Sequence, residues 1–499
     1  MTPPSETVPA ALPNARPVVL APGVTRDFLL HHHLCPIEWA DDGTLVIAAA
    51  PESIRIGLDE LAFAYGCRAT ARDSSDAEVL RHIERLTTNA ERSIELARAE
   101  GGEDDLASDV RDLANQPPVI RYVNLLVRDA YDASASDIHL EATRTGLSAR
   151  FRLDGVLAPA PEPPPTLHHA VVSRIKLLAE LDIAERRRPQ DGRIRVRLES
   201  RELDLRVATV PTMFGESVVL RLLDHGGRPA ELHSLGMGEQ LFDSVARLAA
   251  RPHGMLLVTG PTGSGKTTTL YACLAERDWA SEKIVTVEDP IEYQLPGITQ
   301  VPVHRQAGVT FAAALRSMLR QDPDVVMIGE MRDAETAEIA VQAAMTGHLV
   351  FSTLHTNDAI GAVARLMDLG VPEYLIASTV EGILAQRLVR RICDACRESY
   401  RPNAELVAQL AGRPIGAVAL QRGAGCATCR GTGFRGRVGL FELIEVGDDM
   451  KDAITQRRSR SELRALADTS GRTTIRSDGW AKVQAGLTTV DEVLRVVQV

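Results

Sequence analysis

The sequence predicts an α/β protein whose main domain is a mostly parallel β-sheet covered by helices. Two observations predict this fold. Short apolar runs recur with helical segments between them, at MLLV (255–258), KIVTVE (283–288), DVVMIGE (324–330) and HLVFST (348–353). Strands that alternate with helices favour a parallel, covered sheet. In addition, the first run leads into a glycine-rich loop that is followed by a helical pattern, which is the context of a phosphate-binding loop.

Length and composition limit the classes of protein that remain. A chain of 499 residues predicts three or four domains. The net charge of -11 argues against a nucleic-acid-binding protein, so no nucleic-acid partner is expected. The amino terminus shows no secretory signal, and no apolar run is long enough to cross a bilayer. Two Cys-x-x-Cys pairs indicate metal rather than disulfides in a reducing compartment, so a cytoplasmic protein is expected.

Changes in composition along the chain predict the domain boundaries. Residues 1–24 are rich in Pro, Ala and Thr, and we expect a disordered tail there. The strand patterns RLESRELDLRVATVP and SVVLRLLD indicate a second, strand-rich domain. The remaining segments are a small N-terminal α/β domain (25–85), a helical linker (86–116), the second domain (117–225), a Gly/Pro hinge (226–236), a nucleotide-binding core (237–385), a tetracysteine module (386–445) and a helical C-terminal region (446–499).

The glycine-rich loop Gly260-x4-Gly265-Lys266-Thr267 predicts ATP binding. Its glycines let backbone N–H groups surround phosphates, and the following helix adds its positive dipole end. We expect Lys266 to reach the β and γ phosphates and the Thr267 hydroxyl to bind Mg²⁺. The nucleotide-binding residues are therefore Gly260, Pro261, Thr262, Gly263, Ser264, Gly265, Lys266, Thr267 and Thr268.

Hydrolysis also requires acidic groups beside this loop. The strand before Glu330 carries Gly329 where an aspartate usually binds the metal, so Glu330 is expected to serve Mg²⁺, through a water. Glu292, in the acidic turn after another strand, is the candidate for orienting the attacking water, although a solvated acidic turn is the alternative. His348 and His355 bracket one buried strand and either sense phosphate or cap the strand.

Four ordered motifs resemble the GspE/PilB superfamily of secretion ATPases: GPTGSGKTT (260–268), EDPIEY (288–293), DPDVVMIGEMRD (322–333) and TGHLVFSTLHTND (346–358). Upstream, ASDIHLEA (135–142) and RRRPQDGRIRVR (186–197) resemble the domain that precedes the core in this superfamily. The resemblance implies a RecA-like core, an upstream PAS-like α+β domain and a homohexameric ring. It further implies that Arg206 and Arg221 approach the nucleotide phosphates, within a subunit or from a neighbour.

The four paired cysteines, Cys393, Cys396, Cys426 and Cys429, suit tetrahedral zinc, with reduced thiols as the alternative. Their presence, the ending GLTTVDEVLRVV (486–497) and the short region before the core resemble the type II secretion branch of the superfamily. That branch drives pseudopilus assembly and protein export across the outer membrane. It attaches to the inner membrane through a GspL-like protein bound by the N-terminal region, and it works with an inner-membrane platform protein.

Three other functions stay open from the sequence. The same ATPase can extend a type IV pilus. A hexameric ATPase that moves DNA is disfavoured by the acidic charge and by the small number of aromatic residues for base stacking. A nucleotide-gated scaffold without turnover is disfavoured because Lys266, Thr267, Glu292 and Glu330 are all present.

Overall fold

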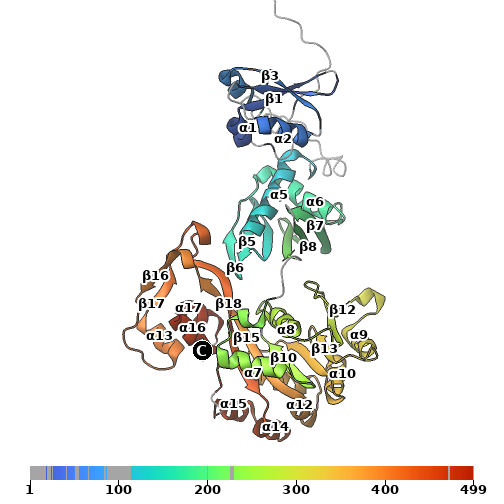
Figure 1. Ribbon diagram of the computed structural model, residues 1–499, viewed down its shortest axis with the longest axis vertical. Coiled ribbons are helices and arrows are strands. Elements are labelled where there is room, and N and C mark those ends of the chain that lie inside the picture. The colour runs from blue at the N-terminus through green and yellow to red at the C-terminus, as the bar shows by residue number, and fades with distance from the viewer. Residues whose placement is uncertain are drawn as a thin grey trace, which may run out of the picture.

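The computed structural model describes residues 26–40, 42–50, 55–65, 67–83, 114–198, 201–224, 230–469 and 472–497, together with Val18, Val24 and Leu86. Most of the tail expected at 1–24, most of the linker expected at 86–116 and residues 226–229 of the expected hinge lie outside these ranges. A small N-terminal domain, a second domain and the core follow one another along the long axis of the molecule (Figure 1). No helix in the described ranges has both the length and the apolar character needed to cross a membrane.

The N-terminal domain is a three-stranded sheet with two helices, α1 (Arg26–His32), β1 (Leu34–Trp39), β2 (Leu45–Ala49), α2 (Arg55–Tyr65) and β3 (Ala69–Asp73). β2 pairs antiparallel with β1 and parallel with β3. Its core is built from aliphatic side chains of all these layers, among them Leu29, Leu34, Ile47 and Leu61. The alternation of short apolar runs and polar breaks therefore folds into a small α/β unit.

The second domain is a six-stranded antiparallel sheet covered by two helices. The strand order is β6-β5-β4-β9-β8-β7, and every pair is antiparallel. The elements are α5 (Pro117–Asp132), β4 (Asp137–Thr143), β5 (Gly146–Leu153), β6 (Val156–Pro159), α6 (His168–Leu178), β7 (Gln190–Leu198), β8 (Arg201–Thr212) and β9 (Gly215–Asp224). Alternate residues of β5 and β9 are buried, which is why their sequences show a period of two.

A buried ion pair fixes one end of this domain. The Lys176 ammonium of α6 donates to Glu216 Oε1 at 2.8 Å and to the Glu185 carbonyl at 2.6 Å. Only 1% of the Lys176 side chain is exposed. Because Glu216 is the second residue of β9 and Glu185 lies in the loop before β7, this one cation joins a helix, a strand and a loop.

The core is a seven-stranded sheet in the order β12-β11-β13-β14-β10-β15-β18. All neighbouring strands are parallel except the last pair, so the predicted α/β fold class is confirmed. The strands are β10 (Gly254–Thr259), β11 (Ile284–Glu288), β12 (Thr299–Pro302), β13 (Val325–Ile328), β14 (Leu349–Leu354), β15 (Val380–Ile392) and β18 (Phe434–Glu445).

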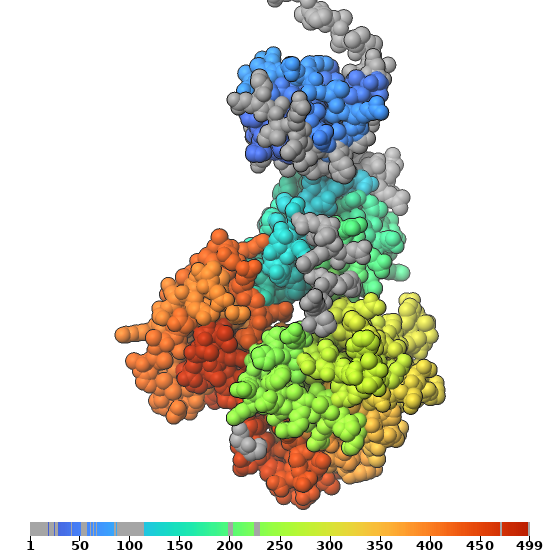
Figure 2. Space-filling model, viewed as in Figure 1, coloured from blue at the N-terminus to red at the C-terminus, as the bar shows by residue number. Residues whose placement is uncertain are grey.

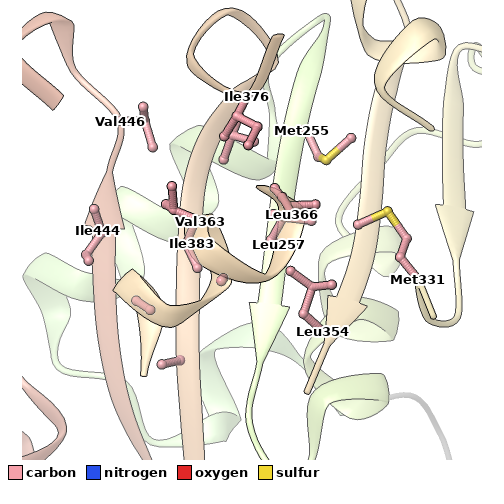
Figure 3. Packing of buried hydrophobic residues seen from close by; sticks show 14 of the residues in the cluster. Met255, Leu257, Met331, Leu354, Val363, Leu366, Ile376, Ile383, Ile444 and Val446 are labelled. Carbon is pink, nitrogen blue, oxygen red and sulfur yellow. The ribbon is translucent and has the colours of Figure 1, made fainter. Parts of the chain in front are cut away.

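Helices cover both faces of this sheet. Leu256 and Val258 of β10 pack with α7 (Glu239–Ala249) and α8 (Lys266–Ala275) on one face. Met255 and Leu257 point to the other face, as Figure 3 shows. There they pack against Val363 and Leu366 of α11 (Ala359–Asp368) and Ile376 of α12 (Glu373–Thr379). The same face packs α9 (Phe311–Met318) and α10 (Ala334–Met345).

The core and the tetracysteine module share one long hairpin. β15 pairs with β18 from Gly382–Glu445 to Ile392–Phe434, and the module lies at its far end. The core boundary expected at residue 385 therefore falls inside β15, because the apolar core pattern ends there while the strand continues. The module contains β16 (Arg397–Tyr400), α13 (Ala404–Ala411) and β17 (Leu420–Gly423), and the chain ends in α14 (Asp448–Thr455), α15 (Arg460–Thr469), α16 (Ile475–Gln484) and α17 (Val490–Val496).

We predict that Lys176→Met destabilises the protein by about 3–5 kcal/mol, because it leaves the Glu216 carboxylate buried without its cation. The double variant Lys176→Met/Glu216→Leu should recover most of that loss, since neither buried charge remains. Urea unfolding of the full chain, followed by circular dichroism, measures both. A single variant as stable as the parent protein would show that the ion pair does not hold the domain together.

Candidate nucleotide site and metal centre

The phosphate loop lies between β10 and α8, at the carboxyl edge of the core sheet. Gly260, Gly263 and Gly265 have φ values of 152°, 78° and 87°. A Cβ atom on Gly260 would lie 2.4 Å from the Gln386 carbonyl oxygen, and one on Gly265 would lie 2.9 Å from the Gln386 amide nitrogen. Glycine is required at both positions by backbone conformation and by the close approach of β15. The loop leads directly into the amino end of α8, which favours anions.

Lys266 is held across this loop. Its ammonium donates to the carbonyl groups of Gly260 at 2.9 Å and Pro261 at 3.1 Å. Burial lowers the pKa of Lys266 to about 8, while the charge of Glu330 raises it and that of Arg387 lowers it. The hydroxyl of Ser264 is buried and has no hydrogen-bond partner within the described residues. Thr267 is half-buried and Thr268 exposed in the first turn of α8, so hydroxyl, ammonium and amide groups converge on one anion-binding position.

Glu330 reaches the same edge from β13. Its carboxylate lies 2.7 Å from Arg332 Nε and 3.3 Å from His355 Nε2, and 13% of its side chain is exposed. β13 and β14 are adjacent parallel strands, so Glu330 and His355 follow strand ends that lie side by side. The structure thus brings Lys266, Glu330 and His355 together. Hydroxyl and carboxylate oxygens are the ligands that Mg²⁺ prefers, so Thr267 and Glu330 fit a magnesium site.

The acidic turn after β11 has two parts with different surroundings. Glu288 is buried and accepts hydrogen bonds from the Tyr271 hydroxyl, from Thr286 at 2.6 Å and from Gln300 at 3.1 Å. These bonds connect α8, β11 and β12, so the Glu288 carboxylate has a structural role. Glu292 is half-buried, and its charge acts on Arg206 of the second domain.

Arg206 and Arg221 face this acidic turn across a cleft of about 960 Å³ between the second domain and the core. They are directly paired on β8 and β9. Arg221 donates to Asp137 at 2.9 Å, and the Nε of Arg206 is buried without a partner in the described part of the chain. Burial lowers the pKa of Arg206, and Glu292 counteracts this. Residues 260–268 do not line this cleft, whereas Asp289 and Pro290 do, so within one chain these arginines lie toward the acidic turn rather than over the phosphate loop.

His348 lies at the other end of β14. It precedes the first residue of the strand, about 20 Å from the carboxyl edge. Its Nδ1 atom lies 2.9 Å from the Ala343 carbonyl oxygen and 3.1 Å from the Thr346 hydroxyl at the end of α10. This position corrects the expectation that His348 is catalytic within its own chain, because the two ends of a strand cannot face the same ligand. The sequence left two roles open for His348, sensing phosphate or capping the strand, and its contacts match capping.

A second pocket, of about 360 Å³, lies directly against the phosphate loop. Besides residues 261–264 it is lined by Asp154 of the second domain and by Arg387, Arg437 and Arg495. The sequence motifs did not point to these residues. Arg387 reaches this pocket because β15 continues past the end of β10. The sequence alone does not show this, because the register between the two strands must be known.

The four cysteines of the tetracysteine module form one cluster. Their sulfur atoms all lie within 4.8 Å of one another, with separations of 3.9 Å for Cys393–Cys426, 3.8 Å for Cys396–Cys429 and 3.7 Å for Cys426–Cys429. A tetrahedral zinc ion with Zn–S bonds of about 2.3 Å requires sulfur separations of about 3.8 Å. The donor set and its dimensions therefore fit zinc.

Backbone groups prepare this cluster for metal. The N–H groups of Cys426 and Gly433 donate to the Cys429 sulfur at 3.1 and 3.2 Å, and that of Gly425 donates to Cys396 at 3.3 Å. Burial raises the pKa of Cys429, but the donors from Cys426 and Gly433 outweigh it and lower the pKa to about 6. Such a cysteine is readily present as the thiolate that zinc binds.

Several known proteins are similar to this chain over most of its length. A family model described as type II/IV secretion system protein matches residues 112–495. The chain is 44% identical to type II secretion system protein E of Xanthomonas campestris pv. campestris, over 99% of this chain and 87% of the relative. It is 46% identical to type II secretion system ATPase E of Vibrio cholerae, over 86% and 84% of the two chains.

Two further matches concern pilus proteins. The chain is 41% identical to the type IV pilus assembly ATPase PilB of Myxococcus xanthus, over 94% of this chain and 85% of the relative. The crystal structure of the pilus retraction motor PilT with bound ADP aligns with 75% of this chain and 96% of that chain, with a TM-score of 0.50 and 26% identity.

We predict that the purified protein contains one zinc ion per chain, which Cys393→Ser or Cys429→Ser removes, because three thiolates and a hydroxyl hold zinc far more weakly than four thiolates. Elemental analysis by mass spectrometry measures the zinc content. Cys67→Ser, outside the cluster, is the matched control and should keep the metal. A folded, metal-free parent protein would contradict the assignment.

Proposed function

The chain belongs to the family of type II/IV secretion system proteins, and from this premise we propose that it is the ATPase motor of a type II secretion system. It couples hydrolysis of Mg-ATP to assembly of a pseudopilus and thereby to protein export across the outer membrane. Its core is the RecA-like fold of secretion ATPases. The observation that carries the proposal is the meeting of Lys266, Glu330 and His355 beside the phosphate loop, in a chain that matches type II relatives along almost its whole length.

The chemistry follows from the positions of these groups. Phosphoryl transfer needs in-line positioning and compensation of negative charge more than covalent help from the protein. The Lys266 ammonium exchanges the loop carbonyl groups for phosphate oxygens when ATP binds. Thr267 and Glu330 would hold Mg²⁺, which neutralises phosphate charge. The hydrogen bond between His355 and Glu330 orients that carboxylate.

We assign to Glu292 the role of orienting the attacking water. Glu288 in the same turn cannot take it, because its carboxylate is buried in a hydrogen-bond network with Tyr271, Thr286 and Gln300. Arg206 and Arg221 lie across the cleft from this turn and bring positive charge to the same region. Their contact with the phosphates requires closure of the cleft or the approach of a neighbouring subunit.

The contacts between the second domain and the core supply a route from hydrolysis to movement. Within one chain, Asp154 of the β5–β6 turn accepts a hydrogen bond from the Gly436 N–H at 2.8 Å and lies 3.7 Å from Arg437. The same turn lines the pocket at the phosphate loop. Loss of the terminal phosphate changes the charge that these groups face, and such a differential contact shifts the domain equilibrium.

The assembly and location of the motor follow from the same premise. We propose that it is a homohexamer in the cytoplasm, attached to the inner membrane through a GspL-like protein that binds the N-terminal domain. An inner-membrane platform protein receives the movement. Type II secretion relatives that match across this chain support these partners.

Extension of a type IV pilus is the second candidate, favoured by the 41% identity with the PilB relative. We predict that the full chain binds the cytoplasmic domain of a type II platform protein more tightly than that of a pilus platform protein from the same organism. Biolayer interferometry with both domains measures the difference. Tighter binding to the pilus domain would favour pilus extension.

We predict that Glu292→Gln lowers kcat for ATP hydrolysis at least about tenfold, while the affinity for ATP changes little, because an amide cannot accept the proton of the attacking water. Steady-state phosphate release by the full chain measures this. Glu335→Gln, in an exposed pair with Arg316, is the matched control and should retain activity. Parent-like turnover in Glu292→Gln would refute the role of Glu292, and failure of the parent protein to hydrolyse ATP would refute the motor itself.

A further inference from the structure

β15 extends beyond the strand it pairs with. It has 13 residues, whereas its parallel neighbour β10 has 6. The register places Thr259, the last residue of β10, opposite Ala385. The next residues of β15, Gln386 and Arg387, therefore run beside the first residues of the phosphate loop. The Gln386 amide oxygen accepts a hydrogen bond from Thr269 of α8 at 2.7 Å, which fixes β15 against the loop and its helix.

Arg387 projects into the pocket at the phosphate loop, which Thr262, Gly263 and Ser264 also line. One end of its guanidinium is anchored, since Nη2 donates to the Asn357 carbonyl at 2.9 Å. The other nitrogen, Nη1, is buried and has no hydrogen-bond partner among the residues described. Ser264 lines the same pocket, and its buried hydroxyl likewise has no hydrogen-bond partner among the residues described.

The two other arginines of this strand each pair with a carboxylate, although the Nε atom of Arg390 is also buried without a hydrogen-bond partner among the described residues. Arg390 pairs with Glu492 at 2.6 Å, and Arg391 pairs with Asp394 at 3.0 Å. Within the described ranges, Arg387 has no carboxylate within 4.0 Å. The acidic group whose charge acts on it most, Asp358, already pairs with Arg460 and Arg464 at 2.6 Å each. A half-buried guanidinium without an anion is costly, and its usual explanation is an anionic ligand.

We infer that Arg387 binds the polyphosphate of ATP in its own subunit. The inference rests on the proposed function and adds a residue to the site that it describes. In the sheet order, β15 and β13 lie on opposite sides of β10. Arg387 therefore contacts the phosphates from one side of the loop while Glu330 serves them from the other. The free Nη1 takes a phosphate oxygen, as Nη2 keeps its bond to Asn357.

This arrangement explains why the position is an arginine. One guanidinium serves two partners at once, a backbone carbonyl on the β14–α11 turn and a phosphate. Asn357 is two residues beyond His355, whose ring contacts Glu330. Arg387 thus connects the phosphates to the turn that carries the histidine beside the metal-binding carboxylate. A lysine can supply charge there but not the forked geometry.

The test is the affinity of the full-length chain for fluorescent analogues of ATP and ADP. We expect Arg387→Ala to raise the Kd for the ATP analogue at least about tenfold, and Arg387→Lys to raise it less. Arg391→Ala, on the same strand but in an exposed pair with Asp394, should stay within about twofold of the parent protein. Lys266→Ala provides the reference for a site that has lost phosphate binding.

The results for the parent protein and the variants distinguish the role of Arg387 from the proposed function. Parent-like Kd values in Arg387→Ala, with binding lost in Lys266→Ala, would overturn the role of Arg387 and leave the proposed function standing. A parent protein that binds neither analogue would overturn the proposed function instead. Zinc content and thermal unfolding midpoint verify that the variants are folded. If Arg387→Ala does not fold, Arg387→Gln takes its place, and parent-like affinity in that variant would overturn the inference equally.

Discussion

The parallel register of β13, β14, β10 and β15 is the constraint on which the site depends. Because these strands run in the same direction, their carboxyl ends lie on one edge of the sheet, and residues from distant parts of the sequence meet there. Lys266, Glu330, His355 and Arg387 each follow or extend a different strand of this set. Burial also withdraws Lys266 from water at this edge, which lowers its pKa to about 8.

The β15–β18 hairpin connects this edge to the rest of the molecule. Its near half belongs to the core sheet, and its far half ends at the cysteine cluster, so a zinc ion there would brace the strand that carries Arg387. The second domain contacts this hairpin and its module: Asp154 accepts a hydrogen bond from the Gly436 N–H of β18, and the Asp129 carbonyl accepts one from Arg430 of the tetracysteine module. Figure 2 shows this contact where the cyan and orange surfaces meet. Movement of this hairpin in response to a change of charge at the phosphate loop would therefore reach both the tetracysteine module and the second domain directly.

The sequence predicted the fold class and the core strands because local signals were strong. Apolar runs and the glycine-rich loop identified β10, β11, β13 and β14, and the cysteine spacing identified the cluster that the structure assembles. It did not predict that β15 continues past residue 385, because polar and charged residues replace the apolar pattern there. For the same reason Arg387 was missed, since its importance depends on register with β10. His348 was misplaced because a sequence shows that a residue adjoins a strand, but not which end faces the ligand.

A crystal structure of the full chain with Mg²⁺ and a non-hydrolysable ATP analogue tests the central claim most directly. The account predicts that the polyphosphate lies in the loop 260–268, with the metal about 2.1 Å from the Thr267 hydroxyl and Glu330 within reach of it through one water. A nucleotide bound elsewhere, for example in the cleft lined by Arg206 and Arg221 and away from Lys266, would contradict it.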